Sequence, residues 1–368
     1  MLADASLTQS PLFLELSARW LIGSGIREAG GGMARYYLAA ERRNKPVSTE
    51  ITGYASSTFA FLAEETGEAE YRDAATGSAQ FLVNEAWQDE LRAFPFELPA
   101  PGDPALPPAY FFDCGIIVRG LLAVWRLTTD DGLLEAAVAA GRAMAEDFLT
   151  ESAIHPVLSL PSKDVLPYDD ARWSRKPGCY QLKSAMAWLD LERATGEETF
   201  GRYFDRALAL ALASHDSFLP GSDDIEKVMD RLHAYCYFLE GLLPVADRSE
   251  AGAVLESGIR RTASLLGQIA PQFSRSDVYA QLLRLRLYAD AAGVLPLDQV
   301  AAEEAAAIPL FQREDPDPRI NGGFYFGQRD GRLLPFVNPV STAFCLQALF
   351  QWRQYQAGEF QPVTEALI

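Results

Sequence analysis

One arrangement recurs along the chain and limits how it can fold: a loop, then a polar or aromatic residue, then a mostly apolar helix. The first copy is Pro46 to Leu62 (PVSTEITGYASSTFAFL), where Glu50 stands at the helix entry. Such helices are apolar nearly all round, so we expect each to be packed on both sides. Five later stretches repeat the design, beginning near Asp113 (FFDCGIIVRGLLAVW), Tyr180 (GCYQLKSAMAWLDL), His233 (HAYCYFLEGLL), Asp277 (SDVYAQLLRLRLYA) and Asn338 (NPVSTAFCLQALFQW).

Amphipathic helices are predicted between these stretches. Each follows an apolar helix after a turn and carries apolar residues at helical spacing. Five such outer helices lie near residues 71–82, 134–148, 200–211, 251–266 and 297–308, and a helix near 12–21 supplies the sixth. We therefore predict an all-α (α/α)6 toroid, one domain over residues 1–368, with the entries of its inner helices around one cavity.

Two segments are predicted to add short β-hairpins at the rim of this helical fold. The segment from Gly322 to Val337 alternates apolar residues around Asp330-Gly331, a dipeptide typical of a two-residue hairpin turn. The segment from Trp87 to Leu98 is predicted to be a short hairpin or an irregular loop.

Composition narrows the class of protein. A net charge of -18 disfavours nucleic acid as a partner, because phosphate binding rewards clustered Lys and Arg. No apolar run approaches the roughly 18 residues of a membrane span, and the N-terminus lacks the pattern of a secretory signal, so we expect a cytoplasmic protein. The cysteines lie inside helix patterns without metal-ligand spacing, so we expect core thiols and no metal or cofactor: Cys114, Cys179, Cys236 and Cys345.

With helix entries such as TEITGY and CYQLKSAMAW, the chain resembles the six-hairpin glycosidase-like superfamily over nearly its whole length. It also resembles uncharacterised bacterial members of that class linked to surface-polysaccharide metabolism and biosynthesis. The resemblance implies a carbohydrate-active protein with its site at the mouths of the inner helices and an oligo- or polysaccharide as its partner. The superfamily includes glycosidases, uronyl hydrolases, sugar epimerases and polysaccharide lyases, so it does not identify a reaction.

Glu50 and Asp113 are the main candidates for catalysis. Glycoside hydrolysis uses two carboxyl groups, one protonated as the acid and one ionised as the base or nucleophile. Phe111 and Phe112 are expected to desolvate Asp113 and raise its pKa, so Asp113 is the candidate acid and Glu50 the candidate base. Helix capping alone would also place both residues in a first turn.

A second reading is proton abstraction beside the carboxylate of a uronate, as in a uronate lyase or a sugar epimerase. His233, Tyr235 or Tyr180 would act as the base, and Arg175, Lys183 or Arg275 would supply a cation. The sugar 2-epimerase branch typically uses paired histidines, whereas this chain has three in total. A third reading is a non-catalytic saccharide-binding factor in polysaccharide synthesis.

Aromatic and amide side chains near the mouths are candidates for substrate binding. Sugar rings pack their C–H faces on aromatic rings, and their hydroxyls bond to amide and guanidinium groups. Asp277 is a third carboxylate at a mouth, although it or Ser276 is expected to be only an N-cap. The candidates for substrate binding are Tyr54, Trp173, Arg175, Tyr180, Gln181, His233, Tyr235, Asp277, Gln281 and Asn338.

Overall fold

A computed structural model gives the structure of the protein and describes residues 11–99, 105–219 and 224–368. The chain forms two compact units, each described here by itself. Unit 1 comprises Met1–Arg27, Arg35–Lys45 and Leu219–Ile368, and unit 2 comprises Glu28–Ala34 and Pro46–Phe218.

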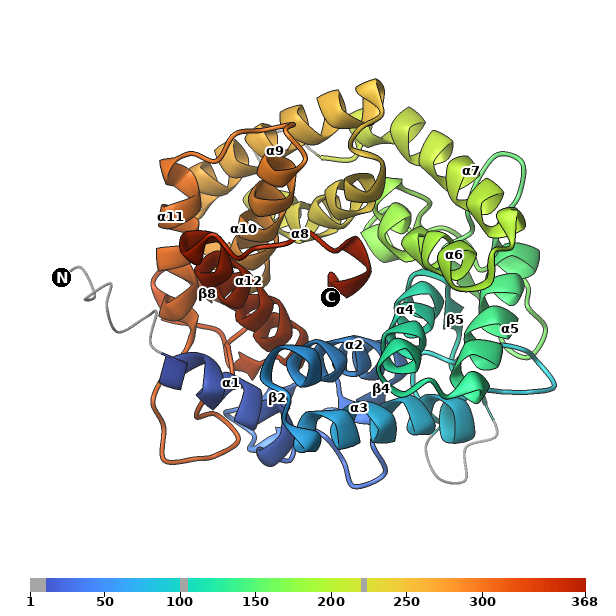
Figure 1. The fold of residues 1–368 in the computed structure, drawn as a ribbon, viewed down its shortest axis with the longest axis horizontal. Helices are drawn as coiled ribbons and strands as arrows, with labels where there is room; N and C mark the ends of the chain where they lie inside the picture. Colours follow the sequence, from blue (N-terminus) through green and yellow to red (C-terminus); the bar gives the residue numbers. More distant parts are fainter. Residues whose placement is uncertain (1–10, 100–104, 220–223) are drawn as a thin grey trace. The chain divides into compact units, whose positions relative to one another are not determined.

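Unit 2 consists of helical hairpins in two layers (Figure 1). The inner helices are buried nearly all round, whereas the outer helices keep an exposed face, as the hydrophobic pattern predicts. The inner helices are α2 (Thr49–Thr66), α4 (Phe111–Thr128) and α6 (Leu182–Thr195), and the outer helices are α3 (Ala69–Phe81), α5 (Asp131–Phe148) and α7 (Glu198–Ser214).

Glycines let α4 approach both of its inner neighbours closely. A Cβ added at Gly120 would lie 2.5 Å from the carbonyl oxygen of Gly53 on α2. A Cβ added at Gly115 would lie 2.4 Å from the carbonyl oxygen of Ser184 on α6. The backbones are therefore in direct contact, which brings the first turns of these helices close together.

Unit 1 repeats this two-layer plan, and the N-terminal helix α1 packs on α12 as an outer element. The Trp20 indole Nε1 on α1 donates a hydrogen bond of 3.0 Å to the carbonyl oxygen of Arg319. The predicted sixth outer helix is thus present. The inner helices are α8 (Ile225–Leu242), α10 (Ser276–Ala291) and α12 (Pro339–Ala357), and the outer helices are α1 (Pro11–Gly23), α9 (Ser249–Ile269) and α11 (Gln299–Ala307).

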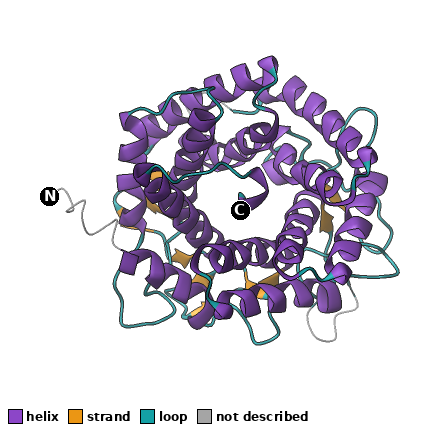
Figure 2. Ribbon diagram, viewed as in Figure 1, coloured by secondary structure: helices purple, strands orange, loops and turns teal. Residues whose placement is uncertain are grey.

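Short antiparallel strands lead directly into four of the inner helices (Figure 2). In unit 2, β4 (Val47–Ser48) precedes α2 and pairs with β1 (Met33–Ala34), and β5 (Ala109–Tyr110) precedes α4 and pairs with β6 (Val157–Leu158). In unit 1, β7 precedes α10 and β10 precedes α12. The strands of unit 1 form two sheets, β10 (Phe336–Val337), β2 (Tyr37–Leu38) and β3 (Arg43–Asn44) in one, and β7 (Phe273–Arg275), β8 (Gly327–Arg329) and β9 (Arg332–Leu333) in the other.

The predicted hairpin around Asp330-Gly331 is confirmed, because β8 and β9 pair across these two residues, which both have positive φ. The segment from Trp87 to Leu98 is an irregular loop with two isolated bridges, one within it between Gln88 and Ala93 and one from Glu97 to Ser48.

The start of one inner helix was predicted wrongly. Helix α8 begins at Ile225, so His233 lies in its third turn rather than at its entry. The Asp224 carboxylate caps α8 by accepting a hydrogen bond of 3.0 Å from the backbone N–H of Lys227. The polar first turns after this cap hide the helix from a search for apolar periodicity.

The cysteine prediction is confirmed: all four are free and buried. Among the described residues, no helix combines the length and the apolar character that crossing a membrane requires.

Candidate functional site

The Asp113 carboxyl of unit 2 is buried, with 5% of the residue exposed. It lies in the first turn of α4 but does not cap it, because the N-cap residue is Tyr110 and makes no side-chain cap bond. The Ser184 hydroxyl donates a bond of 2.6 Å to the backbone oxygen of Phe112, which ties this turn to α6. Within the described part of the chain, no group forms a hydrogen bond with Asp113 Oδ2.

Glu50 lies near enough to Asp113 for the two carboxyl groups to interact. Burial, followed by the negative charge of Glu50, raises the pKa of Asp113 well above its ordinary value. Glu50 is half-buried in the first turn of α2, and the Ser48 hydroxyl caps that helix instead. The N-cap residues are thus Ser48 and Tyr110 rather than the two carboxylates, and Asp113 is the more deeply buried of the pair.

An aromatic group that includes Tyr180 lies near Asp113. Burial, then the charges of Cys179, Asp113 and Tyr110, raises the pKa of Tyr180 well above its ordinary value, so its hydroxyl stays protonated. That hydroxyl donates to the backbone oxygen of Lys176 at 3.1 Å. The Trp173 ring meets the Tyr180 ring edge-on, with 4.9 Å between centroids.

Arg175 brings a positive charge toward the same aromatic group. Its Nη2 lies 3.5 Å from the Tyr110 hydroxyl, and its buried Nε has no hydrogen-bond partner among the described residues. Tyr110 was not among the predicted binding residues, although its place directly before the first residue of α4 was a usable signal. Tyr54, one turn below Glu50 on α2, is buried with 2% exposed.

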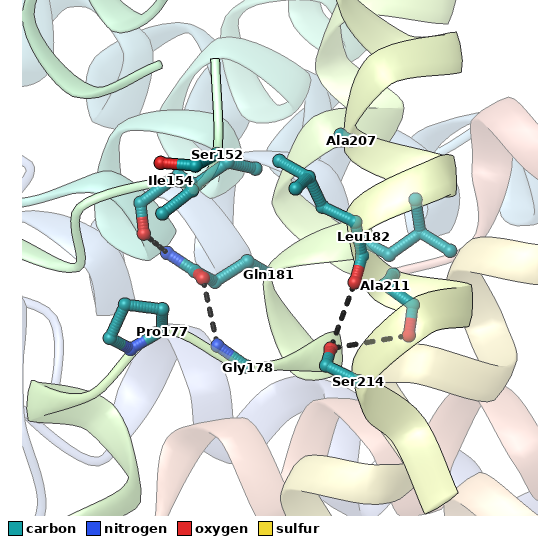
Figure 3. A pocket seen from close by; sticks show the side chains of 11 residues that line it. Ser152, Ile154, Pro177, Gly178, Gln181, Leu182, Ala207, Ala211 and Ser214 are labelled. Atoms are coloured by element: carbon teal, nitrogen blue, oxygen red, sulfur yellow. Dashed lines mark hydrogen bonds between the residues drawn. The ribbon is translucent and has the colours of Figure 1, made fainter. Parts of the chain in front are cut away.

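Gln181 holds the loop before α6 rather than pointing at the carboxylates. Its Nε2 donates to the backbone oxygen of Ile154 at 3.1 Å, and its Oε1 accepts from the N–H of Gly178 at 3.0 Å. Gln181, Gly178 and Ile154 line a separate pocket of about 100 Å³ (Figure 3). This pocket is mostly apolar and lies between the loop, α6 and α7. The Ser214 hydroxyl there bonds to Leu210 and Ala211, so this pocket offers little polar chemistry.

A second cluster lies in unit 1. The Arg275 guanidinium donates two hydrogen bonds to the Asp277 carboxylate, at 3.0 and 2.6 Å, and stacks 4.2 Å from the centre of the Phe326 ring. Asp277 is therefore one half of a buried ion pair, and the prediction of an N-cap there is wrong. The Ser276 hydroxyl does not cap the helix either, because it donates to the backbone oxygen of Tyr325 at 2.8 Å.

His233 joins this cluster through its Nδ1, which lies 2.9 Å from Gln281 Oε1 and 3.5 Å from Asp277 Oδ2. Burial, then the charge of Arg275, lowers the pKa of His233 to about 4, so the ring is neutral at pH 7. Since both neighbours of Nδ1 are acceptors, Nδ1 carries the proton and Nε2 is the basic nitrogen. Burial would raise the pKa of Asp277, but the Arg275 charge and hydrogen bonds outweigh it and lower that pKa.

The other predicted residues have structural partners. Asn338 caps α12, its Oδ1 accepting from the backbone N–H groups of Val340 and Ser341 at 2.8 and 3.2 Å. Tyr235 is buried on α8 with its ring 5.4 Å from that of Phe238. Across the described ranges, no group of three or more His, Cys, Asp and Glu side chains could hold a metal ion.

No protein-family model matches the chain, and no curated protein matches it in sequence. Solved structures do match. A cellobiose 2-epimerase from Spirochaeta thermophila superposes with a TM-score of 0.69 at 13% identity, covering 95% of this chain and 100% of the epimerase. A D-mannose isomerase superposes with a TM-score of 0.68 at 12% identity, covering 93% of this chain and 97% of the isomerase.

An unsaturated glucuronyl hydrolase from Bacillus sp. GL1 superposes with a TM-score of 0.64 at 13% identity, covering 96% of this chain and 97% of the hydrolase. These structures share the six-hairpin glycosidase-like fold, so the predicted all-α (α/α)6 toroid class is confirmed. At such low identity the likeness shows the fold and leaves the reaction open.

Proposed function

We propose that the protein is a carbohydrate-active enzyme that hydrolyses a glycosidic bond, with Asp113 as general acid and Glu50 as base or nucleophile. The observation that carries this proposal is the buried Asp113 carboxyl, whose pKa is raised by burial and by Glu50 and whose Oδ2 has no described hydrogen-bond partner. A buried carboxyl group with a raised pKa beside a second, more exposed carboxylate is the pairing that glycoside cleavage uses. The sugar-processing enzymes among the structural neighbours support the substrate class.

In this mechanism Asp113 donates its proton to the glycosidic oxygen as the bond to the leaving sugar breaks. Glu50, ionised at the N-terminal end of α2, activates a water molecule or attacks the anomeric carbon. The half-buried Trp173 ring, held edge-on against the buried Tyr180 ring, offers apolar surface to a sugar, and Arg175 offers a donor to its oxygens. Product stereochemistry separates attack by water from attack by Glu50.

The test is a screen of an oligosaccharide library for products and for binding, with wild type and Asp113→Asn side by side. We expect product from wild type and a loss of kcat by a factor of roughly 10² to 10⁴ in the variant, because general acid catalysis is removed. Asp131→Asn is the matched control, since Asp131 also lies in the first turn of a helix but is exposed. Undiminished turnover by Asp113→Asn would refute the proposal, and binding without product would favour the binding factor.

The His233 cluster supports a second candidate, proton transfer beside a sugar carbonyl or carboxylate, as in an epimerase or a uronate lyase. A neutral imidazole with Nδ1 held by Asp277 and Gln281 presents Nε2 as a base, and Arg275 supplies a positive charge. Incubation with sugars in deuterated water tests it. Solvent deuterium on carbon would mark epimerisation, and an unsaturated uronate product would mark elimination. Either product from wild type and from the control His155→Gln, but not from His233→Gln, supports this reaction; neither product from wild type contradicts it.

A further inference from the structure

Residues 359–368, called here the C-terminal segment, fold back onto the inner helices of unit 1 after α12 ends at Gly358 (Figure 1). The segment is unevenly held. Leu367 and Ile368 are each 2% exposed, whereas Val363 is 47% exposed. Only its last two residues are thus fully buried among the inner helices.

Main-chain atoms make most of the polar contacts of the segment. The Tyr288 hydroxyl donates to the oxygen of Val363 at 3.0 Å, and Gln347 Nε2 donates to the oxygen of Ala366 at 2.7 Å. Arg284 Nη1 donates to the oxygen of Ile368 at 3.1 Å. A groove lined by tyrosine, amide and guanidinium donors therefore binds a row of oxygen atoms, whatever side chains accompany them.

A buried ion pair forms the base of this groove. Arg284 Nη2 donates to Glu240 Oε1 at 2.6 Å, and both side chains are 0% exposed. The Arg284 guanidinium also lies 4.2 Å from the centre of the Phe344 ring. The groove, defined by Glu240, Arg284, Tyr288, Gln347 and Gln351, thus combines charge, hydrogen-bonding groups and an aromatic face.

The C-terminal segment does not satisfy this groove fully. Within the described ranges, Arg284 Nε and Gln351 Oε1 are buried and have no hydrogen-bond partner. One is a donor and the other an acceptor, and a buried polar group without a partner lowers stability. The backbone N–H of Ile368 does donate to the groove, but to Gln347 Oε1 at 3.1 Å and not to Gln351. A hydroxyl both donates and accepts, so a ligand with several hydroxyls matches both unsatisfied groups.

We propose that the C-terminal segment is a releasable stopper, a part of the chain that occupies a binding groove for a polyhydroxylated ligand, such as a saccharide, in unit 1. Release of the segment exposes Glu240, Arg284 and Gln347 to that ligand. The proposal does not depend on hydrolysis by Asp113, which belongs to unit 2.

Two thiols report on the opening of the groove. Cys236 and Cys345 are 0% exposed, and Arg284 lies near enough to act on the pKa of both. Burial raises both of these pKa values well above the ordinary value. If the segment leaves and water enters the groove, the two thiols are less buried and their pKa values fall. Both thiols would then react faster with a thiol reagent. Cys114 and Cys179, buried in unit 2, report on global unfolding in the same molecule.

The experiment compares full-length Leu367→Glu with full-length Val363→Glu. A buried charge at 367 should release the segment, whereas the same charge at the exposed position 363 should not. Each protein is treated with a thiol reagent, and the labelled cysteines are identified by peptide mass spectrometry. We expect Cys236 and Cys345 to label at least about ten-fold faster in Leu367→Glu, with Cys114 and Cys179 unchanged.

Equal labelling in the two variants, or labelling of all four thiols together, would show that the segment is an inseparable part of unit 1 and would overturn the proposal. If Leu367→Glu does not fold, Leu367→Ser against Val363→Ser makes the same comparison. Glucose, mannose and cellobiose then test the ligand in the released variant. Slower labelling of Cys236 and Cys345 with any of them supports a saccharide, and no protection by all three overturns that assignment.

Discussion

The buried Asp113 carboxyl makes the pH dependence of activity a test of its partner. Glu50→Gln removes the neighbouring negative charge, so the pKa of Asp113 falls. As the acid must be protonated, the alkaline limb of kcat/KM for the residual activity should move to lower pH. If the alkaline limb does not move in Glu50→Gln, the charge of Glu50 does not act on the pKa of Asp113. The control Asp131→Asn should leave the limb where it is in wild type.

His233 gives a second pH effect, this time on stability. Its pKa is about 4 when folded, against 6.5 ordinarily, so the unfolded chain takes up a proton first as the pH falls. Its stabilising effect is therefore complete above pH 6.5 and is lost as the pH falls toward 4. Between pH 7 and pH 5 we expect wild type to lose on the order of 2 kcal/mol more unfolding free energy than His233→Asn. Denaturant unfolding at both values measures this, and equal losses would contradict it.

A feature of the site is predictable from the sequence when the residues that produce it are neighbours in the chain. The desolvation of Asp113 was predictable from Phe111 and Phe112, its neighbours in the chain. The engagement of Gln181 was not, because its partner Ile154 lies 27 residues earlier in a loop without periodicity. The ion pair of Asp277 was not predicted either, although its partner Arg275 is only two residues away in the chain.

At the scale of elements, the approach of α4 to α6 depends on the absence of a side chain at Gly115. Gly115→Ala should lower the unfolding free energy by about 1–3 kcal/mol, because the new methyl group would overlap the backbone of Ser184. Gly267→Ala is the matched control. Gly267 is an exposed residue of α9 with open space around its Cβ position, so alanine there should stabilise by up to about 1 kcal/mol. Thermal unfolding compares the two, and similar shifts would contradict the close approach.

The paired layers of helices were predictable because apolar periodicity is a property of each segment alone. The strands that precede α2, α4, α10 and α12 were missed, apart from the hairpin after Gly322. Strands of two or three residues carry no readable alternation, and their partners are distant in sequence, as with Tyr110 and Val157. These strands nevertheless fix where each helix begins, and so where its polar entry lies.

At the scale of the whole molecule, the single domain over residues 1–368 stays a prediction that unfolding can test. We expect one cooperative transition by far-ultraviolet circular dichroism and by tryptophan fluorescence, shifted as a whole by Gly115→Ala in unit 2. Two transitions, only one of them moved by that substitution, would show that the units fold as separate domains.

The make-up of unit 1 has a consequence for synthesis. Unit 2 is nearly continuous, whereas unit 1 joins residues near the start of the chain to residues near its end, as in the pairing of Tyr37 with Val337. Ribosomes add about 5–20 residues per second, so helix α1 and strand β2 wait on the order of half a minute for α12 and β10. Translation therefore favours completion of unit 2 first, and helix α1, which is made well before α12, is among the last elements of unit 1 to reach its place.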